Sequence, residues 1–418
     1  MVSKWLWIAL SAMPSVVALH AYAREGDQTS VKVEPVRLSL KDACELAARS
    51  SPSVLGARAR ESEAEAGRVE AQVFPRQNPV LEVIGGPKIV DPDVTPSIAV
   101  SLKQTVDLGG GVTAREAKVD ADVDSARAFA GRTSLDISRD VALAFVTVLW
   151  ADERLLVGKE IQTIAAETLR VAELRLKGLD VSKLELNVAR VAVSRSNSAV
   201  HSMEAERAVA MGRLRLLLGI AQEQQIELEG KLGDGMTVDL ADLLGRASGR
   251  PDLLGLAAEL RGAQAESDLA DALAAPQLGF GVQYEHEDEA NTLLGVLSIS
   301  LPFFDHGQGL SAQADATARR VEAERIQLSA RIPIEIRAAY EVYEHRLKSA
   351  KALEDDGAEG YAENLVLAKK GYEAGETTLP DLLLLRREIL EAKLEHLDRQ
   401  LAVRDAAITL LVSAGVSP

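Results

Sequence analysis

The sequence predicts a mainly α-helical protein with a small β part, in which a unit of helix, strand pair and long helical hairpin occurs twice. Two stretches 199 residues apart resemble each other: Pro52, Leu55 and Gly56 recur as Pro251, Leu254 and Gly255, and Val100-Ser101-Leu102 recurs as Ile299-Ser300-Leu301. At slightly shorter spacing, Asp107–Gly111 matches Asp305–Gly309, and Gly178 matches Gly375. A shared order at nearly fixed spacing indicates an internal duplication.

The N-terminus and the duplication together divide the chain. We expect a signal peptide over 1–23, an N-terminal segment over 24–37, a first repeat over 38–220, a linker over 221–237 and a second repeat over 238–416. Lys4, the apolar stretch after it and Ala21-Tyr22-Ala23 have the order of a signal peptide cleaved after Ala23. The alternative is a membrane anchor that stays attached. Pro14 argues against it, because the uninterrupted apolar part is shorter than the ~20 residues of a spanning helix.

Each repeat is expected to begin with a helix and to continue with two strands. The helices are Ala-, Glu- and Arg-rich and should cover 40–73 and 238–274, ending before Pro75 and Pro276. Alternating apolar residues predict strands at about 78–86 and 97–107, and at about 277–285 and 293–304. A period of two gives each strand one apolar face.

The strands raise the question of where the sheet lies. Strands of about nine or ten residues can cross a bilayer when tilted. A membrane barrel needs at least about eight strands, so identical chains would have to pool their four strands. The alternative is a soluble four-stranded sheet packed on helices.

Long helices with few breakers are expected after each strand pair, at 112–176 and 308–373, returning through 182–218 and 380–413. At 1.5 Å per residue the longer ones would extend on the order of 90 Å. The last helix carries a heptad pattern that requires a partner helix, interrupted by Arg387 and Arg404. Pro333 should bend or interrupt its helix. The heptad positions are Leu383, Leu390, Leu394, Leu397, Leu401, Ile408 and Leu411.

Composition narrows the classes of function. A formal charge of −16 and a pI near 5.0 make nucleic acid an unsuitable partner and favour cations or a polycationic partner. The single cysteine, Cys44, cannot form an internal disulfide. The sequence lacks nucleophile-elbow, Walker A and dinucleotide-binding motifs, so we expect neither an enzyme nor a cofactor.

The segment 284–289 is expected in an extracellular loop, where His286 among acidic residues suggests either a metal site or a solvated loop.

The element order and one motif resemble the TolC-type outer-membrane efflux proteins. Tyr372-Glu-Ala-Gly375-Glu-Thr-Thr378-Leu379-Pro-Asp381-Leu382-Leu383 is similar to the family's Y-x-x-G-x-x-T-[ILV]-x-D-[VL]-L at the periplasmic turn of the second hairpin. The resemblance implies a homotrimer in the outer membrane, with a 12-stranded β-barrel continued by a periplasmic α-helical barrel. It also implies two partners, a periplasmic adaptor protein and an inner-membrane cation-driven pump.

Within the family, the sequence looks most similar to the heavy-metal branch that exports cobalt, nickel, zinc or cadmium. The modest length, the lack of a lipidated cysteine and Asn78-Pro79-Val-Leu-Glu82 at the first strand indicate this branch. Export of organic drugs or proteins is the main alternative. A periplasmic adaptor would have one hairpin rather than two, and a structural coiled-coil protein would leave the strands unexplained.

The resemblance assigns roles to residues at the two helical turns. Asp381, with Glu185 in the first repeat, would form an acidic periplasmic entrance gate that concentrates cations. The alternative is that Asp381 only stabilises the start of its helix. A second acid that the family can carry is replaced by Leu384. Gly178 and Gly375 are expected at positive φ in the turns. The adaptor-facing tips would comprise Lys177, Gly178, Leu179, Tyr372, Gly375, Glu376 and Thr377.

Overall fold

The computed structural model describes residues 36–90, 93–221, 224–235, 238–287 and 290–418. The expected signal peptide lies outside these residues. The first repeat contains α1 (Leu40–Ser50), α2 (Pro52–Ala71), β2 (Val80–Val90), β3 (Asp93–Asp107), α3 (Gly111–Lys177) and α4 (Lys183–Leu218). The second contains α5 (Leu240–Arg246), η1 (Ala247–Gly249), α6 (Pro251–Leu273), β5 (Gln277–Glu287), β6 (Ala290–Ser300), α7 (Gln308–Ala374) and α8 (Leu379–Ser413).

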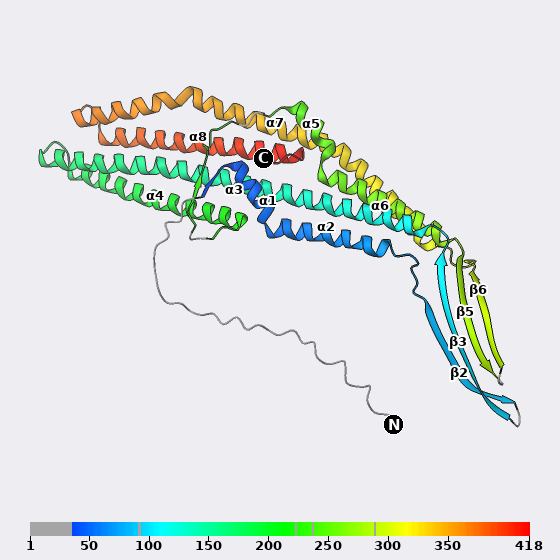
Figure 1. Ribbon diagram of the computed structural model, residues 1–418. Helices are drawn as coiled ribbons and strands as arrows, with labels where there is room; N and C mark the ends of the chain where they lie inside the picture. Colours follow the sequence, from blue (N-terminus) through cyan, green and yellow to red (C-terminus); the bar gives the residue numbers. More distant parts are fainter. Residues whose placement is uncertain (1–35, 91–92, 222–223, 236–237, 288–289) are drawn as a thin grey trace, which may run out of the picture.

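The molecule is an elongated helical body with a four-stranded sheet projecting from one end (Figure 1). The turns of the hairpins α3/α4 and α7/α8 lie at the opposite end. α3 and α7 each contain 67 residues, which corresponds to about 100 Å. The duplicated order of helix, strand pair and long hairpin is therefore confirmed, and both long helices begin and end within one residue of their predicted bounds.

Several predicted elements are wrong in detail. The expected helices 40–73 and 238–274 are each divided, because Pro52 and Pro251 start new helices and lack the N–H that would continue the preceding one. Pro333 was expected to bend or interrupt its helix; it lies inside α7, which continues through it, so the interruption does not occur. β6 ends at Ser300 rather than 304, since the following Pro302 cannot donate a ladder hydrogen bond.

One element pair was not foreseen. β1 (Val36–Leu38) lies across the expected boundary between the N-terminal segment and the first repeat, β4 (Ile226–Leu228) lies in the expected linker, and the two strands pair in parallel. Leu38 and Leu232, which follows β4, join the largest buried cluster together with Phe145 of α3 and Leu214 of α4. The segment between the repeats is therefore packed onto the middle of α3.

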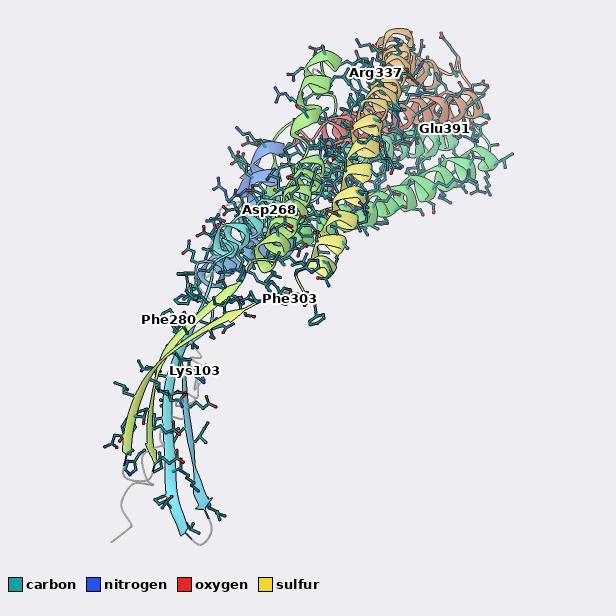
Figure 2. All side chains as sticks on the ribbon, turned by 90° about the vertical axis from the view of Figure 1, so that its right-hand side faces the viewer. Lys103, Asp268, Phe280, Phe303, Arg337 and Glu391 are labelled. Carbon is teal, nitrogen blue, oxygen red and sulfur yellow. The ribbon has the colours of Figure 1, made fainter. Side chains whose placement is uncertain are left out.

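The sheet has the strand order β2-β3-β5-β6, and all its strands are antiparallel. The central pair β3/β5 joins the two repeats, with Ile98 opposite His286 and Asp107 opposite Gln277. Figure 2 shows Lys103 and Phe280 on this sheet and Phe303 where it meets the helices. The segment 284–287 belongs to β5 and not to the expected loop, and 288–289 lie outside the described residues.

The predicted alternation gives the sheet two different faces. Phe280, Val282 and Tyr284 alternate with Gly279, Gly281 and Gln283 along β5. The apolar set lies beside Leu297, Gly295 and Leu293 of β6, and its large side chains are about half exposed. On β3, Ser101 and Lys103 alternate with Ile98, Val100 and Leu102, and the Lys103 ammonium pairs with Glu82 at 2.9 Å. One face is thus mainly apolar. The other carries small and polar side chains on β3 and β5, together with Val80 and Ile84 of β2 and Leu294 and Val296 of β6.

The helices pack as two hairpins connected through α3. α3 packs along its return helix α4 and against α8, and α8 packs along α7, so that α3 and α8 are the inner pair. Alanines are frequent among the buried residues of both helices. Ala142, Ala144 and Ala151 of α3 belong to the cluster of Phe145, and Ala406 and Ala407 of α8 belong to a cluster with Ile332 and Ile336 of α7. Small side chains let helix backbones approach closely. No helix within the described ranges combines the length and apolarity needed to cross a membrane.

Candidate functional site

The two hairpin turns are held together by one small apolar cluster. It combines Ala172, Leu186 and Ala189 of the first hairpin with Tyr372, Leu379 and Leu382 of the second. The Lys369 ammonium of α7 also forms an ion pair with Glu167 of α3. The residues that the family resemblance assigned to the entrance and tips therefore lie at the same end of the molecule.

The first turn differs from its prediction. Gly178 has φ −77°, an ordinary right-handed value, and the positive φ of 65° falls on Leu179. The Asp180 N–H donates to the Arg175 carbonyl at 2.9 Å, and the Leu179 N–H donates to Leu176 at 3.1 Å. This pattern ends a helix with a left-handed residue, a position that glycine normally occupies. Leu179, which is 90% exposed, adopts that conformation without the conformational freedom of glycine.

The second turn follows its prediction. Gly375 has φ +81°, and the Glu376 N–H donates to the Gly371 carbonyl at 2.8 Å. A Cβ at Gly375 would lie 3.6 Å from Arg175 Nη2 of the first hairpin, so space is not the limiting factor. The positive φ alone explains why glycine suits this position.

The two acidic residues of the expected gate occupy equivalent positions in the first turns of α4 and α8. Ser182 caps α4, and its hydroxyl accepts the Glu185 N–H at 3.3 Å. Thr378 caps α8, and its hydroxyl donates to an Asp381 carboxylate oxygen at 2.5 Å while accepting the Asp381 N–H at 3.4 Å. An acid at this position also interacts favourably with the helix dipole. Helix capping is therefore an observed role of Asp381.

Tyr372 was expected at an adaptor-facing tip, and this expectation is wrong. Its side chain is 1% exposed and lies between the hairpins. The Arg175 guanidinium of α3 stacks on its ring at 5.0 Å and donates to its carbonyl oxygen at 3.1 Å. Burial raises the pKa of Tyr372, and the nearby Arg175 charge opposes that effect. Tyr372 therefore joins the hairpins, and Arg175 is a partner that no local sequence pattern indicated.

The remaining tip residues are accessible. Lys177, Gly178, Leu179, Gly375 and Glu376 are exposed, whereas Thr377 is half-buried. Leu384, at the position where the family can carry a second acid, is also exposed. The accessible end of the molecule is thus formed by both turns.

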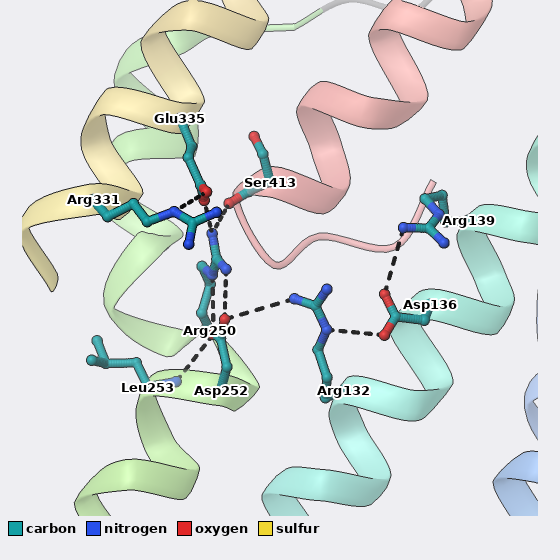
Figure 3. Close-up of polar contacts among 9 residues, drawn as sticks. All are labelled: Arg132, Asp136, Arg139, Arg250, Asp252, Leu253, Arg331, Glu335 and Ser413. Carbon is teal, nitrogen blue, oxygen red and sulfur yellow. Dashed lines mark hydrogen bonds and ion pairs between the residues drawn. The ribbon is translucent and has the colours of Figure 1, made fainter. Parts of the chain in front are cut away.

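A polar cluster joins α6, α7 and α8 to one another (Figure 3). Arg250, which precedes α6 and is 5% exposed, donates to Asp252 at 2.6 and 3.0 Å. The same guanidinium reaches Glu335 of α7 at 3.3 Å and the Ser413 carbonyl of α8 at 2.8 Å. Burial disfavours the charge on Asp252, but the hydrogen bond and charge of Arg250 outweigh it and lower the pKa of that carboxyl. The cluster anchors α6, α7 and α8 to one another.

No group of three or more His, Cys, Asp or Glu side chains in the described part of the chain is arranged to hold a metal ion. His286, which the sequence suggested as a metal ligand, lies in β5, and its Nδ1 is 2.9 Å from the Asn291 amide oxygen of β6. The Tyr284 hydroxyl donates to the same oxygen at 2.7 Å. His286 thus takes part in a cross-strand polar contact.

Comparison with known proteins finds similarity to outer-membrane efflux proteins. Residues 246–416 match the family described as outer membrane efflux protein. The chain is also 28% identical over 372 residues to the cobalt-zinc-cadmium resistance protein CzcC of Cupriavidus metallidurans, a similarity that covers 86% of each chain. Residues 246–416 thus form a domain of the outer membrane efflux protein family, and the chain as a whole has the fold of TolC-type outer-membrane channels.

Two further outer-membrane proteins are similar to this chain. The pyoverdine export outer membrane protein OpmQ of Pseudomonas putida is 23% identical over 333 residues, covering 76% of this chain and 69% of OpmQ. The outer-membrane channel OprN has the same fold, with a TM-score of 0.73 at 20% identity over 90% of this chain and 89% of OprN. The sheet and the hairpin turns of this efflux protein therefore lie at the two ends of a known channel fold.

Proposed function

We propose that the protein is the outer-membrane component of a tripartite efflux system that exports divalent heavy-metal cations, with cobalt, nickel, zinc and cadmium as the candidates. The observation that carries the proposal is the 28% identity to a cobalt-zinc-cadmium resistance protein over 86% of both chains. An inner-membrane cation-driven pump would supply the energy for export, and a periplasmic adaptor would connect the pump to this channel. The strongly negative chain, with a formal charge of −16, is consistent with a cation pathway.

The channel is proposed to be a homotrimer. One chain supplies four strands, fewer than the ~8 that close a bacterial barrel. β2 and β6 form the two edges of the sheet, so β6 of one copy can pair with β2 of the next. Three copies would give twelve strands, with the apolar face toward lipid and the face of Ser101 and Lys103 toward water, continued by a periplasmic barrel of helices.

The entrance is proposed to lie at the hairpin turns. Asp381 and Glu185 sit in equivalent first turns, and three copies of each would place a set of acids around the axis. Such a set raises the local concentration of cations in a narrow opening. The capping contact with Thr378 leaves Asp381 exposed and is compatible with this second role.

The adaptor is proposed to bind the exposed turns. Lys177, Gly178, Leu179, Gly375, Glu376 and Thr377 are the residues of this surface. The exposed Leu179 side chain would give the contact an apolar centre, because covering it with the adaptor would remove apolar surface from water. Tyr372 is not part of this surface, because it is buried between the hairpins.

Export of an organic molecule is the second candidate function. It is supported by the 23% identity to the pyoverdine exporter OpmQ, which covers a smaller share of both chains than the similarity to CzcC. Growth assays must therefore include organic compounds as well as metals.

The test is growth of a strain that lacks this chain, with and without a restored copy. We expect lower tolerance to at least one of cobalt, nickel, zinc and cadmium, and unchanged tolerance to organic dyes. Unchanged tolerance to all four metals would exclude the metal function. If only tolerance to organic compounds fell, the second candidate would replace the first.

The mass of the purified protein tests the proposed assembly. It is expected to equal that of three polypeptides, and a stable monomer would contradict the trimer.

A further inference from the structure

A groove that the proposed cation export does not use lies between α4 and α8, a short distance from the turns. Its volume is about 730 Å³, within the range of ~300–1,000 Å³ that is usual for small-molecule sites. α3 forms its floor through Gly158 and Ile161. The walls are mostly apolar and include Val188 and Val191 of α4 and Leu383 and Leu390 of α8.

The charged group in this groove is Arg386 of α8. The residue is 5% exposed, and its Nη2 donates to the Ile161 carbonyl oxygen of α3. Its Nη1 is buried and has no hydrogen-bond partner among the described residues. Burial lowers the pKa of Arg386, and no nearby carboxylate offsets this effect. A guanidinium that has lost its water and gained one neutral acceptor still requires an anion.

Two further arginines lie at the opening of the groove. Arg195 of α4 and Arg387 of α8 are exposed and line it, and Arg387 pairs with Glu391 at 2.7 Å. The groove is therefore positive within a chain whose formal charge is −16. This local reversal of charge disfavours a metal cation as the occupant and favours an anion.

We propose that the groove binds an amphiphilic organic carboxylate. The carboxylate would accept the free N–H of Arg386 Nη1, and the apolar body would lie between Val191 of α4 and Leu390 of α8. Guanidinium and carboxylate form strong charge-assisted hydrogen bonds, which gives this anion an advantage over a neutral molecule of the same shape. The apolar walls give it an advantage over a small inorganic anion.

The depth of Arg386 argues against a helix as the occupant. An α-helix with its side chains is about 10 Å wide, whereas the Arg386 head is nine-tenths buried beside the floor of the groove. A slender alkyl carboxylate can reach it. A helix of a partner protein or of a neighbouring copy would instead cover the groove and exclude a small molecule, which the experiment can detect.

The experiment uses the full-length protein in phosphatidylcholine nanodiscs and octanoate as the probe. Calorimetric titration, corrected with empty nanodiscs, should show saturable binding of octanoate and at least tenfold weaker binding of octanol and of octyltrimethylammonium. Arg386→Met should weaken octanoate binding about tenfold or more, as expected for the loss of a charge-assisted hydrogen bond. Arg190→Met, which removes an exposed arginine of α4 outside the groove, should change it less than twofold.

A second variant keeps the test decisive if Arg386→Met does not fold. Val191→Trp fills the groove from an exposed position on α4 and leaves Arg386 in place, so it should also abolish octanoate binding. Failure of the wild type to bind octanoate would overturn the proposal, whether because the groove is empty or because another helix covers it. Equal binding of octanol would overturn it too, because Arg386 would then contribute nothing. Metal tolerance plays no part in these outcomes, so they are independent of the cation export proposed above.

Discussion

Replacing Arg250 with methionine removes the buried charge that joins α6 to α7 and α8. The guanidinium makes two hydrogen bonds to Asp252, one to Glu335 and one to the Ser413 carbonyl oxygen. Methionine has a similar length and retains the apolar contacts of the stem. The substitution therefore isolates the loss of the charge and of its four hydrogen bonds.

The expected loss of stability depends on the partners that Asp252 and Glu335 keep when Arg250 is replaced. Removing one partner of a buried ion pair costs about 3–5 kcal/mol. Asp252 keeps Arg132 at 3.7 Å, and Glu335 keeps Arg331 at 2.6 Å. Both carboxylates are also about one-quarter to one-third exposed, so water compensates part of the loss. We therefore expect the lower end of the range, about 3 kcal/mol of local stability.

Hydrogen exchange read by mass spectrometry measures this loss where it occurs. A loss of about 3 kcal/mol makes exchange from the opened state on the order of a hundredfold faster. The faster exchange should be confined to the start of α6 and the last turn of α8. Arg246→Met is the matched control, since Arg246 forms an exposed pair with Asp242 at 2.9 Å and such pairs contribute about 0.5 kcal/mol or less. Exchange in Arg250→Met within threefold of the wild type would refute the assigned role of Arg250.

Four further predictions follow from the same structure. Because the folded state lowers the pKa of Asp252, the ionised carboxylate stabilises the fold above the unfolded pKa of ~3.9, and this stabilisation is lost as the pH falls below that value. The difference in stability between the wild type and Arg250→Met should be constant from about pH 7 to 5 and shrink below about pH 4. A difference that grows toward low pH would contradict this. Leu179→Gly should stabilise the first turn by about 1 kcal/mol, measured by local hydrogen exchange, because it relieves the strain of a left-handed conformation at leucine. Exchange at this turn that is as fast as in the wild type, or faster, would disprove it. Burial raises the pKa of the Cys44 thiol to about 11, so a maleimide at neutral pH should label the unfolded chain and leave the native one unmodified. Asp381→Asn preserves an oxygen for Thr378 but removes the charge, so single-channel recordings should show lower cation selectivity; unchanged selectivity would leave Asp381 with helix capping alone.

The long elements were predictable because local patterns define them. The breaker-free stretches of α3 and α7 identify long helices, and the alternation along β5 identifies a strand. The glycines at their junctions mark where these elements begin or end. The acid in the first turn of α4 and α8 was also visible, since Ser182 and Thr378 precede Glu185 and Asp381 at the spacing of a helix cap.

The features that were missed depend on contacts between distant residues or on backbone strain. β1 and β4 pair across about 190 residues, and a three-residue strand carries no periodicity. Leu179 has a left-handed conformation, which leucine rarely adopts, so the positive φ was predicted at the neighbouring Gly178 instead. Tyr372 belongs to a recognisable motif, but its burial under Arg175 is set by the other hairpin. The partners of Arg250, which precedes α6, and of Arg386 in α8 are likewise decided by tertiary packing, because no local sequence pattern distinguishes these two arginines from the others.

Metal retention by intact cells tests the proposed metal export most directly. Cells lacking this chain, and the same cells with the wild-type copy restored, are loaded with cobalt, zinc and cadmium, and the cell-associated metal is measured over time after transfer to metal-free medium. We predict that the deletion strain retains at least one of these metals longer and that the restored copy returns the loss to the wild-type rate. Equal retention of all three metals in both strains would contradict a role in heavy-metal export.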